Sequence, residues 1–262
     1  MKARKCWLYF QKIRCYCIVF FVTPMFFAFE VLIMRPKYLS LHQMGDVEHL
    51  IHLTIATFLF INVCGNMFLT LLTNTSMKGY KGYGTSYCEI CDIKRPQGSW
   101  HCKTCNACIV GRDHHCSFFV RCVGLYNQRY YVLYLGYVSI SMLYSSYFNF
   151  WYVNSMFQGY EIFISALMVI SSHGVIYQYG YRDLYVLFLL MNLGLFVWMG
   201  ILFAVHFNNV LKGVSARGSR GSNVIVCKED WKKNIRKVFG EKWYWAILWP
   251  FAESPLPLNI ID

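Results

Sequence analysis

The sequence predicts an all-α polytopic membrane protein, in which four transmembrane helices carry a cytoplasmic, cysteine-rich domain between the second and the third. Of its 262 residues, 56% are hydrophobic and only 15% are charged, which is unlike an average soluble protein. The apolar residues gather in stretches long enough to cross a bilayer, which takes about 20 residues as a helix. Cysteine and histidine gather instead in one short polar segment between two of these stretches.

Four apolar stretches predict the membrane spans in chain order. The last three run for more than 20 residues without Asp, Glu, Lys or Arg, and the first is interrupted only by Pro24 and Glu30. A cleaved signal peptide would also explain the basic residues before the first stretch, but this stretch is long and no small-residue cleavage site follows it. We therefore expect spans at residues 15–34, 50–72, 130–153 and 184–207.

The positive charges predict which segments face the cytoplasm. Of the 25 Lys and Arg residues, five precede the first span, eight lie between the second and third spans, and nine follow the last. Basic residues favour the cytoplasmic side of a membrane. The net charge of +12 therefore fits membrane topology, and we expect no nucleic-acid partner. The expected cytoplasmic segments are residues 1–14, 73–129 and 208–262, and the expected luminal loops are residues 35–49 and 154–183.

The second luminal loop contains a fifth uncharged apolar stretch, residues 162–181. Polar residues and glycines interrupt it, and only Arg182 and Asp183 separate it from the last span. A crossing here would also place nine basic residues outside the cytoplasm. We therefore expect an interfacial or re-entrant segment, with a fifth span as the alternative.

Half of the twelve cysteines belong to a repeated pattern. The pattern C-x2-C-x9-H-x6-C occurs twice, and the second copy is offset from the first by fourteen residues. Six thiols and two imidazoles are the ligands of two complete tetrahedral zinc sites. Because this segment is poor in aliphatic residues, zinc would supply its folding free energy. The expected ligands are Cys88, Cys91, His101 and Cys108 for one ion, and Cys102, Cys105, His115 and Cys122 for the other.

A sequential partition of these ligands is the alternative. It would place both C-x2-C pairs on one ion and leave the two histidines unexplained. The interleaved repeat accounts for both histidines, so we favour it. Since the segment is expected in the reducing cytoplasm, its thiols point to metal binding or catalysis rather than to disulfides.

One cysteine of the segment, Cys116, is left over beside Asp113 and His114. This spacing gives a thiol with an imidazole two residues away and a carboxylate that can orient the imidazole, which is the composition of an activated nucleophile. We expect Cys116 as the nucleophile, His114 as the general base and Asp113 as its orienting group. Alternatively, Asp113 and His114 would be hydrogen-bonding groups around a zinc site, and Cys116 a spare ligand.

Further short motifs surround these three residues. They are C-x2-C, Arg-Pro, H-C-x2-C-x2-C, the run Asp113-His114-His115-Cys116, and Cys122-Val123-Gly124-x2-Asn127. Over residues 87–131 the chain resembles the DHHC cysteine-rich domain of the DHHC-type palmitoyltransferases, a family of zinc-dependent integral-membrane protein S-acyltransferases. The place of the segment between the second and third of four helices is similar to the family's architecture as well.

The resemblance implies that Cys116 carries a palmitoyl or similar long-chain acyl group from acyl-CoA to cysteine thiols of proteins, as an acyl-thioester enzyme intermediate. By position, His114 and Asp113 would activate Cys116, and two structural zinc ions would occupy the eight ligands given above. Acyl-CoA, typically palmitoyl-CoA, would be the co-substrate. The partners would be protein substrates bearing membrane-proximal cysteines, and the lipid bilayer. Family tendency suggests the endoplasmic reticulum or Golgi membrane, with the cysteine-rich domain and both termini cytoplasmic.

The phosphates of CoA require cations. Lys94 and Arg95 lie near the basic position that the family has before Pro96. We expect both to bind these phosphates, and the alternative is that they are solvated surface charges.

The chain departs from the family pattern in three places, one of which is Asn74-Thr75-Ser76-Met77, where the family has Asp-Pro-Gly after the second helix. The other two follow the nucleophile and the last helix. Ser117 and Phe118 stand where most members have Pro-Trp, and Val214-Ser215-Ala216-Arg217 stands in place of Thr-Thr-x-Glu. Nucleophile, base and zinc ligands are unaffected, so we expect changes in efficiency and substrate docking rather than in reaction type. A catalytically weak or inactive zinc-stabilised membrane scaffold of the same fold is the alternative function.

Two remaining features are interpreted structurally. The basic tail, with its interleaved tryptophans, is expected to form an amphipathic segment, either on the anionic leaflet or against the protein's own domain. Polar residues within the predicted spans are interpreted as helix-packing groups, namely Glu30, Asn62, Asn66 and Asn192.

Overall fold

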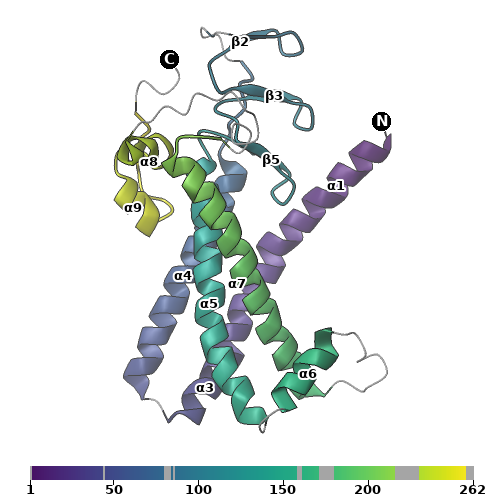
Figure 1. The fold of residues 1–262 in the computed structure, drawn as a ribbon, viewed down its shortest axis with the longest axis vertical. Helices are drawn as coiled ribbons and strands as arrows, with labels where there is room; N and C mark the ends of the chain where they lie inside the picture. The colour runs from purple at the N-terminus through teal and green to yellow at the C-terminus, as the bar shows by residue number, and fades with distance from the viewer. Residues whose placement is uncertain are drawn as a thin grey trace. The chain divides into compact units, whose positions relative to one another are not determined.

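The computed structural model describes residues 2–43, 45–79, 84, 86–157, 161–170, 180–215 and 230–257. This part of the chain is mostly helical, with a short β-rich segment between helices α4 (Asp46–Leu72) and α5 (Gln128–Met156) (Figure 1). The chain forms two compact units. Unit 1 comprises Met1–Phe21, Asn62–Tyr134 and Phe203–Asp262, and unit 2 comprises Val22–Ile61 and Leu135–Leu202.

Long helical stretches occupy the regions of the four predicted spans. Helices α4 and α5 cover the second and third, and helix α7 (Tyr181–Leu211) covers the fourth. Among the described residues, three stretches are long and apolar enough to cross a membrane, namely Tyr9–Leu41, Asp46–Leu72 and Arg182–Leu211. Helix α5 is 29 residues long, but its tyrosines and serines make it less apolar. The count of four spans therefore stays a prediction.

The first helical stretch is irregular, and prolines explain where it changes. Pro24 and Pro36 each stand in the first turn of a helix that follows a wider π-helical segment. A proline has no N–H to donate and clashes with the preceding turn, which a wider turn relieves. The order is α1 (Lys2–Cys17), π-helix Ile18–Val22, α2 (Thr23–Phe29), π-helix Glu30–Met34 and α3 (Arg35–Leu41).

Unit 2 contains a buried polar cluster around Glu30. Its Oε1 accepts hydrogen bonds from Ser145 Oγ at 2.5 Å and from Asn149 Nδ2 at 3.0 Å. Asn192 Nδ2 on α7 donates to the same Ser145 Oγ at 2.8 Å. Polar groups inside a span are costly without partners, and this network supplies them across three of the predicted spans. It supports the interpretation of Glu30 and Asn192 as helix-packing groups.

Helix α6 (Glu161–Ile170) covers the first half of the apolar stretch 162–181. In unit 2, Ser165 Oγ donates a hydrogen bond to Asp183 Oδ1 at 2.6 Å, which fastens α6 to the start of α7. Residues 171–179 lie outside the described residues. The re-entrant interpretation therefore stays a prediction.

The cysteine-rich segment of unit 1 forms three antiparallel β-hairpins, so the all-α expectation is wrong for this part of the chain. Each strand has three residues, and each hairpin repeats the previous one after fourteen residues (Figure 1). Strands this short leave no detectable alternation in the sequence. The pairs are β1 (Ser86–Cys88) with β2 (Ile93–Arg95), β3 (Trp100–Cys102) with β4 (Ala107–Ile109), and β5 (His114–Cys116) with β6 (Arg121–Val123).

The third hairpin is a further copy of the first two, which the two-copy ligand pattern did not predict. Cys88, Cys102 and Cys116 each end the first strand of their hairpin, in the same register. The sequence did contain an indication of this third copy, because Cys116 follows Cys102 by the same fourteen residues. Each turn also has its left-handed residue at the same place, namely Asp92 with φ 53°, Asn106 with φ 48° and Val120 with φ 53°.

We expect Val120→Asn to raise the thermal stability of the protein. A β-branched side chain at positive φ is strained, whereas Asn and Asp, found at this place in the first two hairpins, tolerate it. Relief of the strain should add about 1 kcal/mol to the free energy of unfolding. Thermal denaturation in detergent would show a higher midpoint for Val120→Asn, with Val120→Ala as the control that keeps a positive-φ penalty. An unchanged or lower midpoint for Val120→Asn would mean that the turn stores no strain.

The tail docks on the protein itself in its described part. Helix α8 (Trp231–Phe239) buries Ile235 and Phe239, while its lysines face outward. Asn234 Nδ2 donates to the Leu211 carbonyl at the end of α7 at 2.9 Å. For α8 this favours docking against the protein's own domain over the leaflet. The short helix α9 (Trp243–Leu248) follows, and residues 216–229 and 258–262 lie outside the description.

Candidate functional site

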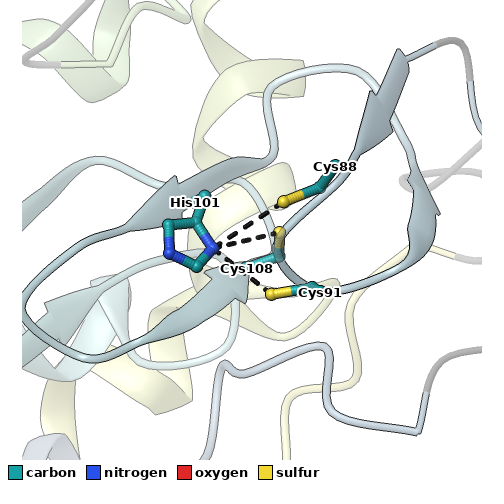
Figure 2. Close-up of side chains that lie close together, drawn as sticks. All are labelled: Cys88, Cys91, His101 and Cys108. Atoms are coloured by element: carbon teal, nitrogen blue, oxygen red, sulfur yellow. Dashed lines mark hydrogen bonds between the residues drawn. The ribbon is translucent and has the colours of Figure 1, made fainter.

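The first copy of the ligand pattern forms a compact group. His101 on β3 directs its Nδ1 toward three sulfurs (Figure 2). The first hairpin supplies the two sulfurs of its C-x2-C turn, and the second hairpin supplies the imidazole and the third sulfur. A bound cation would therefore join two hairpins. The Nδ1···S distances are 3.2 Å to Cys91, 3.7 Å to Cys88 and 3.9 Å to Cys108.

The second copy repeats this arrangement between the second and third hairpins. His115 Nδ1 lies 3.3 Å from Cys105 Sγ, 3.7 Å from Cys102 Sγ and 3.8 Å from Cys122 Sγ. The hydrogen bond between Cys105 and Cys122 lowers the pKa of Cys105 to about 4. One thiolate of this group is therefore favoured even before a cation binds.

Both groups have the dimensions of a tetrahedral zinc site. Zinc lies about 2.3 Å from sulfur and about 2.0 Å from nitrogen, so neighbouring S and N ligands should be about 3.5 Å apart and two sulfurs about 3.8 Å apart. The N···S distances of 3.2–3.9 Å and the Cys105–Cys122 sulfur distance of 3.7 Å match these values. Both interleaved sets could hold a metal ion, and the structure does not bring the sequential set together.

Strand β5 separates metal ligands from the candidate catalytic residues. Side chains alternate between the two faces of a strand, so His114 and Cys116 share one face and His115 lies on the other. His115 turns into the second metal group. A metal ion there would fix the third hairpin, and with it the direction of His114 and Cys116.

His114 and Cys116 on the other face of β5 form a trio with Asp113, the residue directly before the strand. His114 Nδ1 lies 2.8 Å from Asp113 Oδ2, and the Cys116 thiol interacts with the same imidazole. Burial alone would lower the pKa of His114, but the hydrogen bond with Asp113 and the interaction with Cys116 outweigh it and raise this pKa to about 9. The surroundings thus favour a protonated His114 imidazole in contact with the Cys116 thiol.

Two further residues belong to this group, and the sequence-based prediction missed both. His206 on α7 places Nδ1 3.4 Å from Asp113 Oδ2 and Nε2 3.4 Å from the Tyr131 hydroxyl on α5. The signal for His206 was its position inside a predicted span, where an ionisable residue is a functional candidate by default. Tyr131 gave no signal, because tyrosines are frequent throughout this chain.

The turn of the third hairpin packs on aromatic side chains of α5. The ring of Phe118 stacks on Tyr134 with centroids 6.0 Å apart, and Phe119 meets Tyr134 edge-on at 5.3 Å. Arg14 on α1 donates a hydrogen bond to the Ser117 carbonyl at 3.0 Å. Phe118 thus anchors the turn as an aromatic residue, and these contacts hold it without the fixed backbone of a proline.

Gly124 and Asn127 tie the third hairpin to the helices before and after it in unit 1. Asn127 Oδ1 accepts from the Gly124 N–H at 2.9 Å, and Nδ2 donates to the carbonyls of Cys122 at 3.1 Å and Thr70 at 3.2 Å. A Cβ at Gly124 would lie 2.6 Å from the Val110 carbonyl oxygen, so a larger residue would push the backbone away. Both residues of the motif therefore fix the hairpin that carries Cys116.

Lys94 and Arg95 lie on β2 of the first hairpin. The Arg95 guanidinium contacts the carbonyls of Tyr87 at 3.4 Å and Ser99 at 3.5 Å, and lies over the Trp100 ring. Arg95 is thus engaged within the protein, whereas Lys94 is exposed. Of these two, Lys94 is better placed for an anionic ligand, and phosphate binding by either stays a prediction.

Comparisons with known proteins agree with this geometry. A family model described as DHHC palmitoyltransferase matches residues 81–220, more than half of the chain. The chain is 27% identical over 231 residues to the Homo sapiens protein named probable palmitoyltransferase ZDHHC24, covering 82% of this chain and 78% of that protein. It is also 27% identical over 248 residues to the Danio rerio palmitoyltransferase ZDHHC22, covering 87% and 86%, respectively. The chain therefore belongs to the DHHC palmitoyltransferase family.

Proposed function

We propose that this protein transfers palmitoyl or a similar long-chain acyl group from acyl-CoA to cysteine thiols of other proteins, with Cys116 as the nucleophile. The observation that carries the proposal is the trio of Asp113, His114 and Cys116, in which the His114 imidazole interacts with both the Asp113 carboxylate and the Cys116 thiol. This is a base placed between its orienting group and a nucleophile.

In the first step, His114 accepts the thiol proton of Cys116, and the thiolate attacks the carbonyl carbon of the acyl-CoA thioester. The bond from this carbon to the CoA sulfur breaks, and the leaving CoA thiolate takes the proton back from His114. Free CoA and an acyl thioester on Cys116 result. Asp113 binds Nδ1 of His114, which leaves Nε2 for the thiol.

In the second step, a cysteine of the protein substrate takes the place of Cys116 as attacking thiol. It gives its proton to His114, attacks the enzyme thioester and releases the Cys116 thiolate, which is reprotonated. Exposing the acyl chain to water would cost about 0.8 kcal/mol per CH₂, so the chain should stay in apolar surroundings. Substrate cysteines are therefore proposed to lie close to a membrane.

Two zinc ions complete the proposal in a structural role. Each group offers three sulfurs and one nitrogen, which fit tetrahedral zinc and leave no ligand position for water or substrate. Zinc would hold successive hairpins together and do no chemistry. The charge distribution supports a cytoplasmic position for this segment and both ends of the chain, and family tendency supports an endoplasmic reticulum or Golgi membrane.

Loading with a labelled acyl-CoA tests the proposed function. Purified protein should acquire a label from palmitoyl-CoA that neutral hydroxylamine removes, because hydroxylamine cleaves thioesters. The label should then move to a cysteine peptide anchored in lipid vesicles. Labelling no greater than that of heat-denatured protein would reject the proposal.

We expect His114→Ala to slow this loading about 10²- to 10⁴-fold, because a positioned general base typically contributes this much. The metal content should stay unchanged, since His114 points away from the metal group that holds His115. Rapid-quench kinetics and metal analysis would measure both quantities. His115→Ala is the matched control, one residue away on the opposite face, and should lose metal. Metal loss in His114→Ala would contradict the assignment.

A further inference from the structure

One carboxylate oxygen lies between two histidines. Asp113 Oδ2 is 2.8 Å from His114 Nδ1 and 3.4 Å from His206 Nδ1. The Asp113 side chain is only 1% exposed and that of His206 only 11%. A buried carboxylate requires donors around it, and a donor on either side restricts how it can rotate.

His206 also contacts Tyr131, through the ring nitrogen that does not face Asp113. Its Nε2 lies 3.4 Å from the Tyr131 hydroxyl, and the two rings meet edge-on with centroids 5.0 Å apart. The two ring nitrogens of His206 thus face different partners: Nε2 faces the Tyr131 hydroxyl, and Nδ1 faces Asp113 Oδ2, to which an N–H at Nδ1 can donate.

We infer that His206 is a positioning residue for acyl transfer, which holds the Asp113 carboxylate so that His114 keeps its Nε2 directed at Cys116. Without His206 the carboxylate would lose the contact on one side, and the orientation in which it selects the tautomer of His114 would be held less firmly. This inference rests on the proposed function and adds a residue of α7 to the machinery of the β5 trio.

A metal ion is the competing interpretation, because the ligand atoms of Asp113, His114 and His206 lie within 4.8 Å of one another. Oxygen and nitrogen ligands of a tetrahedral zinc ion would be about 3.3 Å apart. The distance between Asp113 and His114 is 2.8 Å, which is that of a charge-assisted hydrogen bond. We therefore favour hydrogen bonding, and metal content is part of the test.

Three substitutions of His206 distinguish the effect of its N–H donor to Asp113 from the effect of its side-chain volume. His206→Ala removes both contacts. His206→Asn keeps an N–H donor close to the place of Nδ1, whereas His206→Gln moves the donor to the place of Nε2, away from Asp113. Asn208→Ala is the matched control, because Asn208 is exposed on the same helix.

We expect His206→Ala to slow thioester formation at Cys116 about 10- to 100-fold at saturating palmitoyl-CoA. The KM for palmitoyl-CoA and the metal content should stay at wild-type values. His206→Asn should restore most of the rate, His206→Gln should remain slow, and Asn208→Ala should behave as wild type. Alkylation of Cys116 by iodoacetamide, followed by mass spectrometry of its peptide, should slow in the same order.

A wild-type loading rate in His206→Ala would overturn the inference. So would an Asn variant as slow as the Ala variant at equal thermal stability, since the donor would then be irrelevant. A further metal ion in the wild type that is lost in His206→Ala would replace the positioning role by a metal site. If the wild type does not load at all, the proposed function fails, and the order of alkylation rates still tests the role of His206.

Discussion

Cys116→Ser is expected to abolish acyl transfer, with loading at least about a thousand-fold slower than in the wild type. The hydroxyl of serine gives up its proton far less readily than a thiol, and His114 cannot generate the alkoxide as it can the thiolate. Serine has nearly the same shape, and Cys116 lies outside both metal groups, so fold and metal content should be preserved. The loss would therefore report on chemistry rather than on folding.

The measurement must separate Cys116 from the other free thiols of the chain. Labelling with palmitoyl-CoA, neutral hydroxylamine treatment and peptide mapping would locate the adduct. Cys17→Ser is the control, because Cys17 is an exposed thiol at the predicted membrane boundary, and it should load as the wild type does. An adduct of wild-type intensity in Cys116→Ser would refute the assignment. A weak adduct that resists hydroxylamine would support it, since an oxygen ester at Ser would behave in this way.

The interleaved metal groups could be predicted from the sequence because their geometry is local and periodic. A fixed offset of fourteen residues places each C-x2-C turn against the His and Cys of the next copy, and the structure brings together these same sets. The direction of His114 relative to His115 also follows from sequence neighbours, through the alternation of a strand. The spacing of residues along the chain is therefore sufficient to predict the metal groups and the direction of His114.

Other features depend on tertiary contacts that spacing does not encode. His206 reaches Asp113 from α7, across most of the second half of the chain. A helical pattern indicates that a residue lies in a span, but not which partner it meets. The three-residue strands are local features, but they were missed because they are too short to show the two-residue alternation of a strand. The first predicted span is helical, as expected. Its two π-helical segments were not predicted, because they depend on how the chain accommodates Pro24 and Pro36.

The third hairpin explains why one cysteine remains for chemistry. Each metal group takes two thiols from one hairpin and a His and a Cys from the next. After the third hairpin the chain continues as α5 from Gln128, so no fourth hairpin offers ligands to Cys116. Phe119 stands where the second cysteine of the turn would be, and packs on Tyr134. The proposed nucleophile thus occupies the position that Cys88 and Cys102 hold in the first two hairpins, without a further hairpin to complete a metal group with it.

Replacing a metal ligand should also reduce acyl loading strongly. The reduction should differ between the two metal groups. Structural zinc contributes about 10–16 kcal/mol to the folding of small zinc domains. Cys105→Ser weakens the group that holds the hairpin of Cys116, so we expect acyl loading to fall more than about 100-fold. Cys91→Ser, the equivalent position one copy earlier, weakens the group that holds the first hairpin. Its loading should fall less, because the contacts between the second and third hairpins remain.

Metal analysis and acyl loading of the same preparations would test this order, with Cys17→Ser as a thiol control outside both groups. The wild type should contain two zinc ions per chain. The second hairpin contributes ligands to both groups, so each variant should also bind the remaining ion more weakly than the wild type does. Fewer than two ions in the wild type would contradict the paired sites. Full activity in Cys105→Ser would mean that the other contacts of the third hairpin hold it without metal, among them those of Asn127 and the packing of Phe118 on Tyr134.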